Sequence, residues 1–134
     1  MKDRVAHALA WFRKAESDIK NARRTIASDG PFDTACFHVQ QAAEKYLKGL
    51  LAFHDQPIPK THDIEELQKE CLSFIPHSTM KDMDLTVLTD YAVDARYDFD
   101  FWPDQTTAEE SLQLAERIRA LVLDVMPKEA QPEN

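Results

Sequence analysis

The polar side chains of one central segment have types and a spacing that suit phosphate binding. At about 100° per residue, five of them would lie within a band of about 80° on one side of a helix. They are Thr34, His38, Gln41, Lys45 and Lys48. In one interpretation, the imidazole and the two ammonium groups meet a phosphate, and Gln41 hydrogen-bonds a base or a ribose. In the other, which is the more common one for helical bundles, the band is an ordinary solvated face.

A second candidate lies at Lys60 and His62, just before a segment with helical spacing. Free backbone N–H groups at a helix N-terminus bind anions, so these amides and the two side chains could hold a phosphate together. Alternatively, Asp63, Glu65 and Glu66 follow at once and could neutralise both groups. We keep Lys60 as a supporting residue of the candidate phosphate site.

A row of acidic residues marks a third candidate. Asp90, Asp94 and Asp98 are spaced by four and would share one edge of a helix. Such carboxylates could hold Mg²⁺. The favoured interpretation is an ion-pair seam with basic side chains of the first segment. Those side chains are Arg13, Lys20 and Arg24. Arg96 stands on the other flank of the same segment and could reach a phosphate or pair with an acid.

Four aromatic residues gather directly after this row. They are Tyr97, Phe99, Phe101 and Trp102. Aromatic rings can stack on nucleobases. More often, such a cluster seals the end of a helical bundle or forms a subunit contact, and we favour that role.

Charge and glycine content limit how a phosphate could be bound. The chain has 134 residues, only two of them Gly, and a formal net charge of −8. So few glycines exclude Gly-rich phosphate loops, which leaves side chains and helix ends as phosphate ligands. An acidic chain also disfavours non-specific nucleic-acid binding, so RNA is the less favoured ligand. Residues 1–28 nevertheless carry a local charge of +4.

Five segments with helical spacing of apolar residues must position these groups, and Pro and Gly separate them. We predict an all-α fold, an antiparallel up-and-down bundle of four long helices plus a shorter fifth. The predicted helices cover residues 3–28, 33–54, 62–75, 80–97 and 107–126, the third being the short one. One domain would span 1–128, with a flexible tail over 129–134.

Individual residues suggest how these helices begin, end and approach one another. Asp33 and Thr61 are the predicted N-caps of the second and third helices. Thr106 with Glu109 matches a capping box before the fifth. Gly30 fits a left-handed end of the first helix. Gly49 lies inside the second helix, where it suggests either close helix packing or mere tolerance of a glycine.

Cysteine, histidine and hydropathy patterns bear on compartment and cofactors. Cys36 and Cys71 form no Cys-x-x-Cys pair, which favours a reducing, cytoplasmic setting. The sequence has no apolar run near the roughly 20 residues of a membrane span, so we expect no membrane association. The five His lack metal-ligand spacing, and we predict no metal and no cofactor.

Three stretches together resemble the HEPN domain family. They are the run from Ala35 to Lys48, the Thr61-His62-Asp63-Ile64 turn, and the stretch from Tyr91 to Asp98. The resemblance covers most of the chain and implies an antiparallel helical bundle, usually a homodimer. It also implies nucleotide or RNA binding and, for many bacterial members, a minimal nucleotidyltransferase encoded beside the HEPN protein. The toxin branch cleaves RNA with an Arg followed four to six residues later by a His. Here no His follows His77, so Arg96 lacks that partner.

Our first hypothesis is therefore a non-catalytic, homodimeric module that binds a nucleotide or a nucleotidyltransferase protein. The candidate site residues are His38, Gln41, Lys45 and Lys48, supported by Lys60 and Arg96. One alternative is an RNase toxin with an altered active site. Another is an antitoxin or scaffold subunit without a small ligand.

Overall fold

The computed structural model describes residues 3–76 and 79–132, and every regular element in this part of the chain is helical. The α-helices are α1 (Arg4–Ile26), α2 (Phe32–Phe53), α3 (Ile64–Cys71), α4 (Thr86–Tyr97) and α5 (Gln105–Asp124). Short 3-10 turns are η1 (Leu72–Phe74), η2 (Met80–Asp82) and η3 (Lys128–Ala130). The predicted all-α helical bundle is confirmed.

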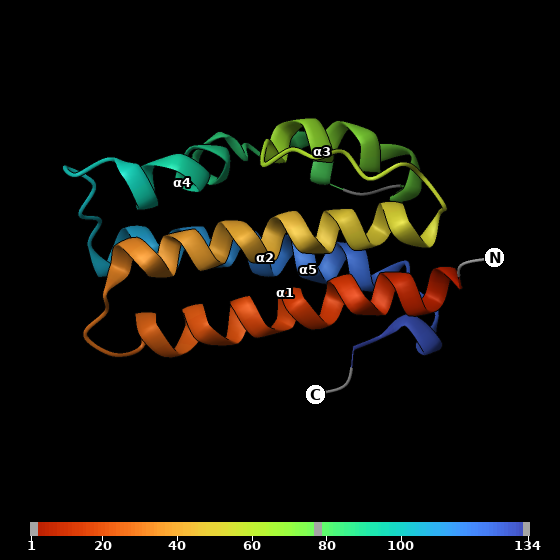
Figure 1. Cartoon of the computed structure of the whole chain (residues 1–134), viewed down its shortest axis with the longest axis horizontal. Coiled ribbons are helices and arrows are strands. Elements are labelled where there is room, and N and C mark those ends of the chain that lie inside the picture. Colours follow the sequence, from red (N-terminus) through yellow and green to blue (C-terminus); the bar gives the residue numbers. More distant parts are fainter. Residues whose placement is uncertain (1–2, 77–78, 133–134) are drawn as a thin grey trace.

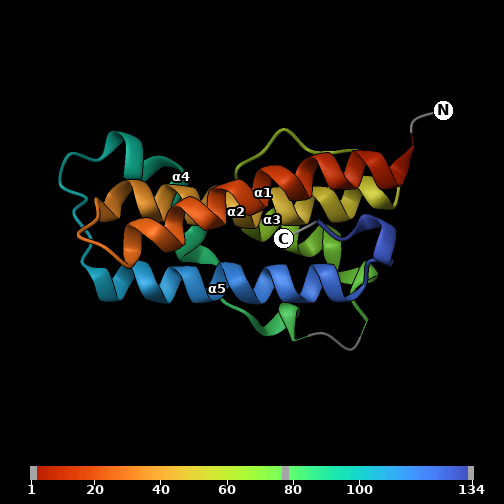
Figure 2. The same ribbon diagram turned by 90° about the horizontal axis from the view of Figure 1, so that it is seen from below.

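The helices are arranged around α2, which contacts each of the other four α-helices. Figure 1 shows α1 and α2 side by side along the long axis, with α3 and α4 as a second layer along the other edge of α2. Figure 2 shows α5 running along the same axis, beside the α1–α2 pair. The chain reverses between α1 and α2 at Gly30, whose φ of +91° confirms the predicted left-handed position.

Apolar stripes from three long helices build the core. Phe12 and Ile19 of α1, Tyr46 of α2 and Ile118 of α5 are fully buried. Burying one large apolar side chain stabilises a fold by about 1.5–3 kcal/mol, so these contacts hold the three helices together. Because α2 contacts all four other α-helices, it is buried on nearly all sides, including at Lys48, one of the candidate phosphate ligands.

Gly49 lies where α1 and α2 approach most tightly. A Cβ atom added at this position would lie 2.4 Å from Cε1 of Phe12, which is itself fully buried. This distance confirms the prediction of close helix packing at Gly49. The cost of about 1 kcal/mol for Gly inside a helix is therefore offset by the contact between the Phe12 ring and the α2 backbone.

The predicted caps are each wrong by two residues. Pro31, rather than Asp33, is the N-cap residue of α2. Asp63, rather than Thr61, caps α3, because its carboxylate accepts from the Glu66 N–H at 3.1 Å. At α5, the cap is Asp104, which accepts from the Thr107 N–H at 2.8 Å, in place of the predicted Thr106–Glu109 box.

The fourth helix begins at Thr86, six residues later than predicted, and has 12 residues. The Gln68 side-chain amide donates to the backbone carbonyls of Met80 and Met83. Because these carbonyls are satisfied by a side chain of α3, residues 80–85 form a 3-10 turn and an extended step instead of a helical turn.

The predicted ion-pair seam between the first helix and the row of acids on α4 is wrong within the described residues. α4 packs on α2, on the side away from α1 (Figure 1). The ion pairs of α1 go to α5 and α2 instead. They include Arg23–Glu116, Glu16–Arg119 and Asp18–Lys45, each at 2.6 Å.

The C-terminal residues that the structure describes lie against the bundle. Ala130 is fully buried. The Gln131 amide donates to the carbonyls of Leu123 at 2.6 Å and Met126 at 3.1 Å. The predicted flexibility of residues 129–134 stays a prediction, and residues 133 and 134 lie outside the described part. Among the described residues, no helix combines the length and apolarity that crossing a membrane requires.

Candidate functional site

Two of the predicted site residues gather on a single carboxylate of the neighbouring helix. Asp18 of α1 contacts His38 Nδ1 through Oδ1 at 3.0 Å and Lys45 Nζ through Oδ2 at 2.6 Å. The Asp18 side chain is only 13% exposed, so this contact is partly shielded from water. We call these three residues the Asp18 cluster.

A second cluster forms around Glu44, the residue before Lys45 in α2. Its Oε2 contacts Lys48 Nζ at 3.0 Å, and its Oε1 contacts His62 Nδ1 at 2.8 Å. The Gln40 amide donates to the same Oε1 at 3.0 Å. The Glu44 side chain is 5% exposed. Buried carboxylates persist in proteins when charged or hydrogen-bonded partners surround them, as here.

Gln41 joins this Glu44 cluster through its neighbour. Its amide donates to Gln40 Oε1 at 2.7 Å, and Gln40 also donates to the His62 carbonyl at 3.3 Å. His62, at the loop before α3, thereby closes the cluster against α2. The structure thus brings His38, Gln41, Lys45 and Lys48 onto one side of α2, in two neighbouring groups.

Lys60 and Arg96 lie apart from these two clusters. Lys60 is exposed in the loop before α3 and makes no ion pair within the described residues. Arg96 donates through Nε and Nη2 to the Ala92 carbonyl, at 2.9 and 2.7 Å. Its guanidinium carbon is 5.1 Å from the ring centroids of Phe37 and Tyr97. Arg96 is therefore held at the end of α4 rather than beside the lysines.

Each lysine of the two clusters is paired with one carboxylate. Lys45 and His38 contact Asp18, and Lys48 and His62 contact Glu44. An ammonium group has three donors, so each lysine keeps N–H groups beyond its ion pair. Lys48 also lies 5.7 Å from the Trp11 ring centroid and is only 8% exposed. Chemically, the face can offer N–H donors to an anion, but the anion must compete with Asp18 and Glu44.

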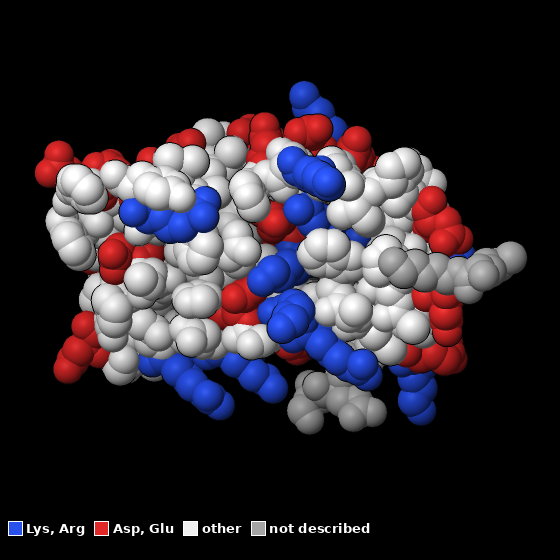
Figure 3. All heavy atoms as spheres, viewed as in Figure 1, with Lys and Arg blue, Asp and Glu red and all other residues white. Residues whose placement is uncertain are grey.

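The surface around these clusters has mixed charge. Figure 3 shows Lys and Arg side chains crossing the middle of this face in a broken line, with Asp and Glu side chains between them. Within the described residues, no group of three or more His, Cys, Asp or Glu side chains could hold a metal ion. The row of Asp90, Asp94 and Asp98 therefore does not form a Mg²⁺ site of that kind.

Three aromatic side chains at the end of α4 point into solvent. Tyr97 is 66% exposed, Phe99 88% and Trp102 73%. We call these three residues the aromatic edge. Phe101 differs from them, because its ring packs on Tyr91 with centroids 5.3 Å apart. Of the four aromatic residues in this stretch, Phe101 is the one that packs inward and seals the end of the bundle.

Sequence reasoning missed a buried ionic group that ties α1, α2 and α5 together. Arg119 donates to Glu16 through Nε at 2.6 Å and Nη2 at 3.1 Å, and the Tyr46 hydroxyl donates to the same carboxylate. Burial by itself would raise the pKa of Glu16. The hydrogen bonds from Arg119 and Tyr46 outweigh it and lower that pKa below 4.5.

Sequence reasoning also missed the two carboxylates that organise the candidate face. Glu44 carried a local signal, because it lies four residues before Lys48 on the same helix. Asp18 carried none, since it belongs to another helix, 27 residues before Lys45.

Comparisons with known proteins agree with this architecture. The family model of the HEPN domain matches residues 8–125. The crystal structure of TT1696 from Thermus thermophilus is similar, with a TM-score of 0.75 and 27% sequence identity, over 90% of this chain and 98% of that one. No curated protein matches the chain. Since the family model spans nearly all of the bundle, the chain belongs to the HEPN domain family.

Proposed function

We propose that this HEPN domain is a non-catalytic module that works as a homodimer and binds a nucleotide or a nucleotidyltransferase protein. Membership of the HEPN family supports the general class of the proposal. The aromatic edge is the observation that carries the homodimer. The two lysine clusters support the nucleotide.

The aromatic edge supports self-association because it leaves large apolar side chains in water. Phe99 and Trp102 are 88% and 73% exposed, and Val93 on α4 adds a further 56% exposed side chain. Clustered apolar side chains on a surface mark interaction sites. In a twofold dimer, the same patch from each chain would meet its copy, so one patch serves both subunits.

The nucleotide part of the proposal rests on Lys45 and Lys48, with His38 and Gln41 beside them. These side chains come from one helix and share one face, which lets them contact one extended phosphate chain. A phosphate would take up lysine donors that Asp18 and Glu44 leave unused. Lys60 is exposed in the loop before α3 and would add a further positive charge.

The ribonuclease alternative finds less support. Two donors of the Arg96 guanidinium are bound to the Ala92 carbonyl. The family's Arg–His pairing has no counterpart at this position, because no His follows Arg96 in the chain.

We also place the module in the cytoplasm, on the basis of two buried and unpaired cysteines, Cys36 and Cys71.

Sedimentation velocity over a range of concentrations tests the homodimer, and calorimetry tests the ligand. We expect a concentration-dependent shift to the dimer. We also expect heat of binding with at least one nucleoside di- or triphosphate, reduced about tenfold in affinity by Lys45→Ala. A chain that stays monomeric would overturn the first part. No heat with any nucleotide, together with no co-purification with the neighbouring gene's product, would overturn the second.

A further inference from the structure

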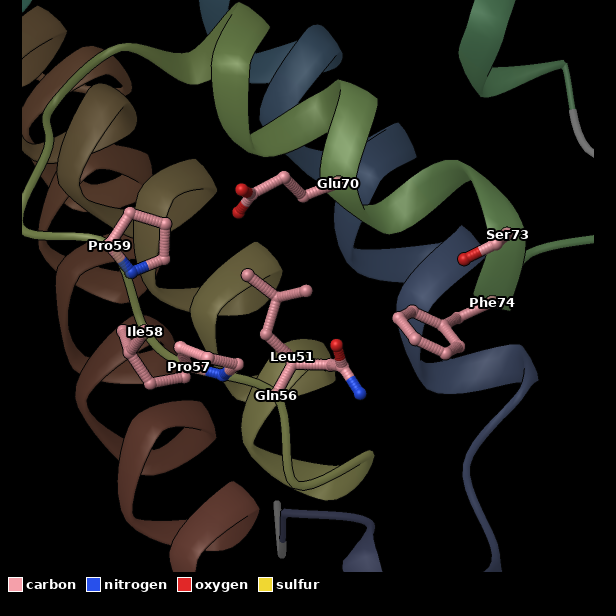
Figure 4. A pocket seen from close by; sticks show the side chains of 8 residues that line it. All are labelled: Leu51, Gln56, Pro57, Ile58, Pro59, Glu70, Ser73 and Phe74. Atoms are coloured by element: carbon pink, nitrogen blue, oxygen red, sulfur yellow. The ribbon is translucent and has the colours of Figure 1, made fainter.

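A pocket of about 370 Å³ lies between the loop that leads into α3 and the 3-10 turn that follows α3 (Figure 4). Small-molecule sites in proteins usually have about 300–1,000 Å³, so this pocket can hold a small ligand. None of its lining residues belongs to the Asp18 or Glu44 cluster or to the aromatic edge. The pocket is therefore separate from the residues that carry the proposed function.

Most of the residues that line the pocket are apolar, and contacts within the fold hold them in place without a ligand. Leu51, from the last turns of α2, is 1% exposed and is anchored in the core. Pro57 and Pro59 stiffen the opposite wall, because their rings fix the backbone φ angle. Phe74 stacks on the His54 ring, with centroids 4.0 Å apart and planes 9° apart. A binding partner would therefore meet a preformed apolar surface.

One carboxylate faces this apolar surface without a partner of its own. Figure 4 shows the Glu70 side chain reaching from α3 toward the loop, with its carboxylate over the space above Leu51. Within the part of the chain that the structure describes, Glu70 makes no ion pair and no side-chain hydrogen bond. The lining contains no Lys, Arg or His. The negative charge of Glu70 is thus available to a ligand.

The other polar groups of the pocket can accept hydrogen bonds from a ligand. One N–H of the Gln56 amide donates to the His54 carbonyl at 3.1 Å. The amide oxygen is left as an acceptor. The Ser73 hydroxyl can accept as well as donate. An anion such as a nucleotide phosphate would be repelled by the Glu70 carboxylate, so this pocket is unsuited to it.

We propose that this pocket binds a small organic cation with an apolar body. The ammonium or guanidinium group would lie on the Glu70 carboxylate, and the body would pack against Leu51, Ile58 and Phe74. The formal net charge of −8 adds a general attraction for cations. A charge-assisted hydrogen bond beside an apolar wall gives both orientation and affinity.

Three probes of nearly equal shape and different charge test the proposal on the full chain. They are 2-phenylethylamine, 2-phenylethanol and 3-phenylpropionate. Amide NMR titrations should show saturable shifts at residues 51, 56, 58 and 70–74 with the amine. The alcohol should bind about tenfold more weakly, and the carboxylate should cause no saturable shift there.

Variants separate the charge of Glu70 from a general acidic surface. Glu70→Gln should weaken amine binding about tenfold. Glu66→Gln removes the same charge one turn away, outside the pocket, and should change the affinity by less than about twofold. Ser73→Phe, at an exposed position on the rim, should abolish the shifts by filling the space. Equal binding of all three probes, or unchanged binding in Glu70→Gln, would overturn the proposal. So would the absence of shifts at about 10 mM amine.

Discussion

Lys45 of α2 and Asp18 of α1 are joined by a contact of 2.6 Å between Nζ and Oδ2. Lys45, which the helical spacing predicted to be a phosphate ligand, therefore already has an anionic partner within the fold. His38 shares that partner through Asp18 Oδ1. A nucleotide that binds at this face must add to this arrangement or replace the carboxylate, and the two cases can be separated by removing the Asp18 charge.

Asp18→Asn should raise the affinity for nucleotide phosphate if Lys45 is a phosphate ligand. Removing the competing carboxylate frees a charged donor, and a charged hydrogen bond contributes about 1.5–3 kcal/mol, so we expect a gain of about tenfold by calorimetry. Asp29→Asn changes the net charge equally at an exposed turn, and serves as the control. Equal affinities of the two variants would show that Lys45 does not contact the phosphate.

Glu16→Gln should destabilise the fold at neutral pH, because it breaks the bidentate pair with Arg119. Loss of one partner of a buried pair costs about 3–5 kcal/mol, and we expect about 2–4 kcal/mol here since the Arg119 side chain is 27% exposed. Glu116→Gln breaks a contact of the same length with Arg23 on an exposed surface. It should cost less than about 1 kcal/mol. Urea unfolding at pH 7 gives both values.

The same pair predicts a direction for acid stability. The pKa of Glu16 in the folded chain is lowered below 4.5, so the unfolded chain binds more protons in this range. The stabilisation that the ionised Glu16 carboxylate contributes is complete above pH 4.5 and is lost as the pH falls through the pKa of Glu16 in the folded chain. The difference in unfolding free energy between wild type and Glu16→Gln should therefore shrink below pH 4.5. If this difference in unfolding free energy grew as the pH fell, the predicted direction of the pH dependence would be wrong.

Gly49→Ala should destabilise the chain although Ala is the better helix former. The added Cβ would lie 2.4 Å from Cε1 of Phe12, and overpacking of this kind costs about 1–3 kcal/mol. Thermal unfolding should show a lower Tm for Gly49→Ala. In the Phe12→Leu background the same substitution should cost clearly less, because the ring that clashes is gone. An equal cost in both backgrounds would rule out the Phe12 contact as the reason.

Local patterns predicted most of the helices, and tertiary contacts explain where they failed. The apolar stripes of α1, α2 and α5 were visible because one face of each helix is buried over many turns. The start of α4 was not, since it depends on Gln68 of another helix bonding the Met80 and Met83 carbonyls. The caps of α3 and α5 were misplaced because more than one Asp or Thr near each start can accept from free N–H groups. The cap of α2 was misplaced because the N-cap residue of this helix, Pro31, makes no side-chain cap hydrogen bond.

The candidate face was predictable in the same limited way. Helical spacing alone places His38, Gln41, Lys45 and Lys48 on one side of α2. It does not reveal that Asp18 approaches from α1 or that His62 folds back onto Glu44, because such pairings depend on how the helices pack. The aromatic run was recognised, but its division into Phe101, which packs inward, and exposed Phe99 and Trp102 required the structure.

The molar mass in solution, measured by light scattering, tests the proposed homodimer most directly. The wild type should give twice the 15.4 kDa of one chain. Phe99→Ser/Trp102→Ser should give the mass of one chain with unchanged helical circular dichroism. Phe101→Ser, whose ring packs on Tyr91, should lower the Tm and keep the dimer mass. A monomeric wild type, or a double variant that remains dimeric, would contradict assembly through the aromatic edge.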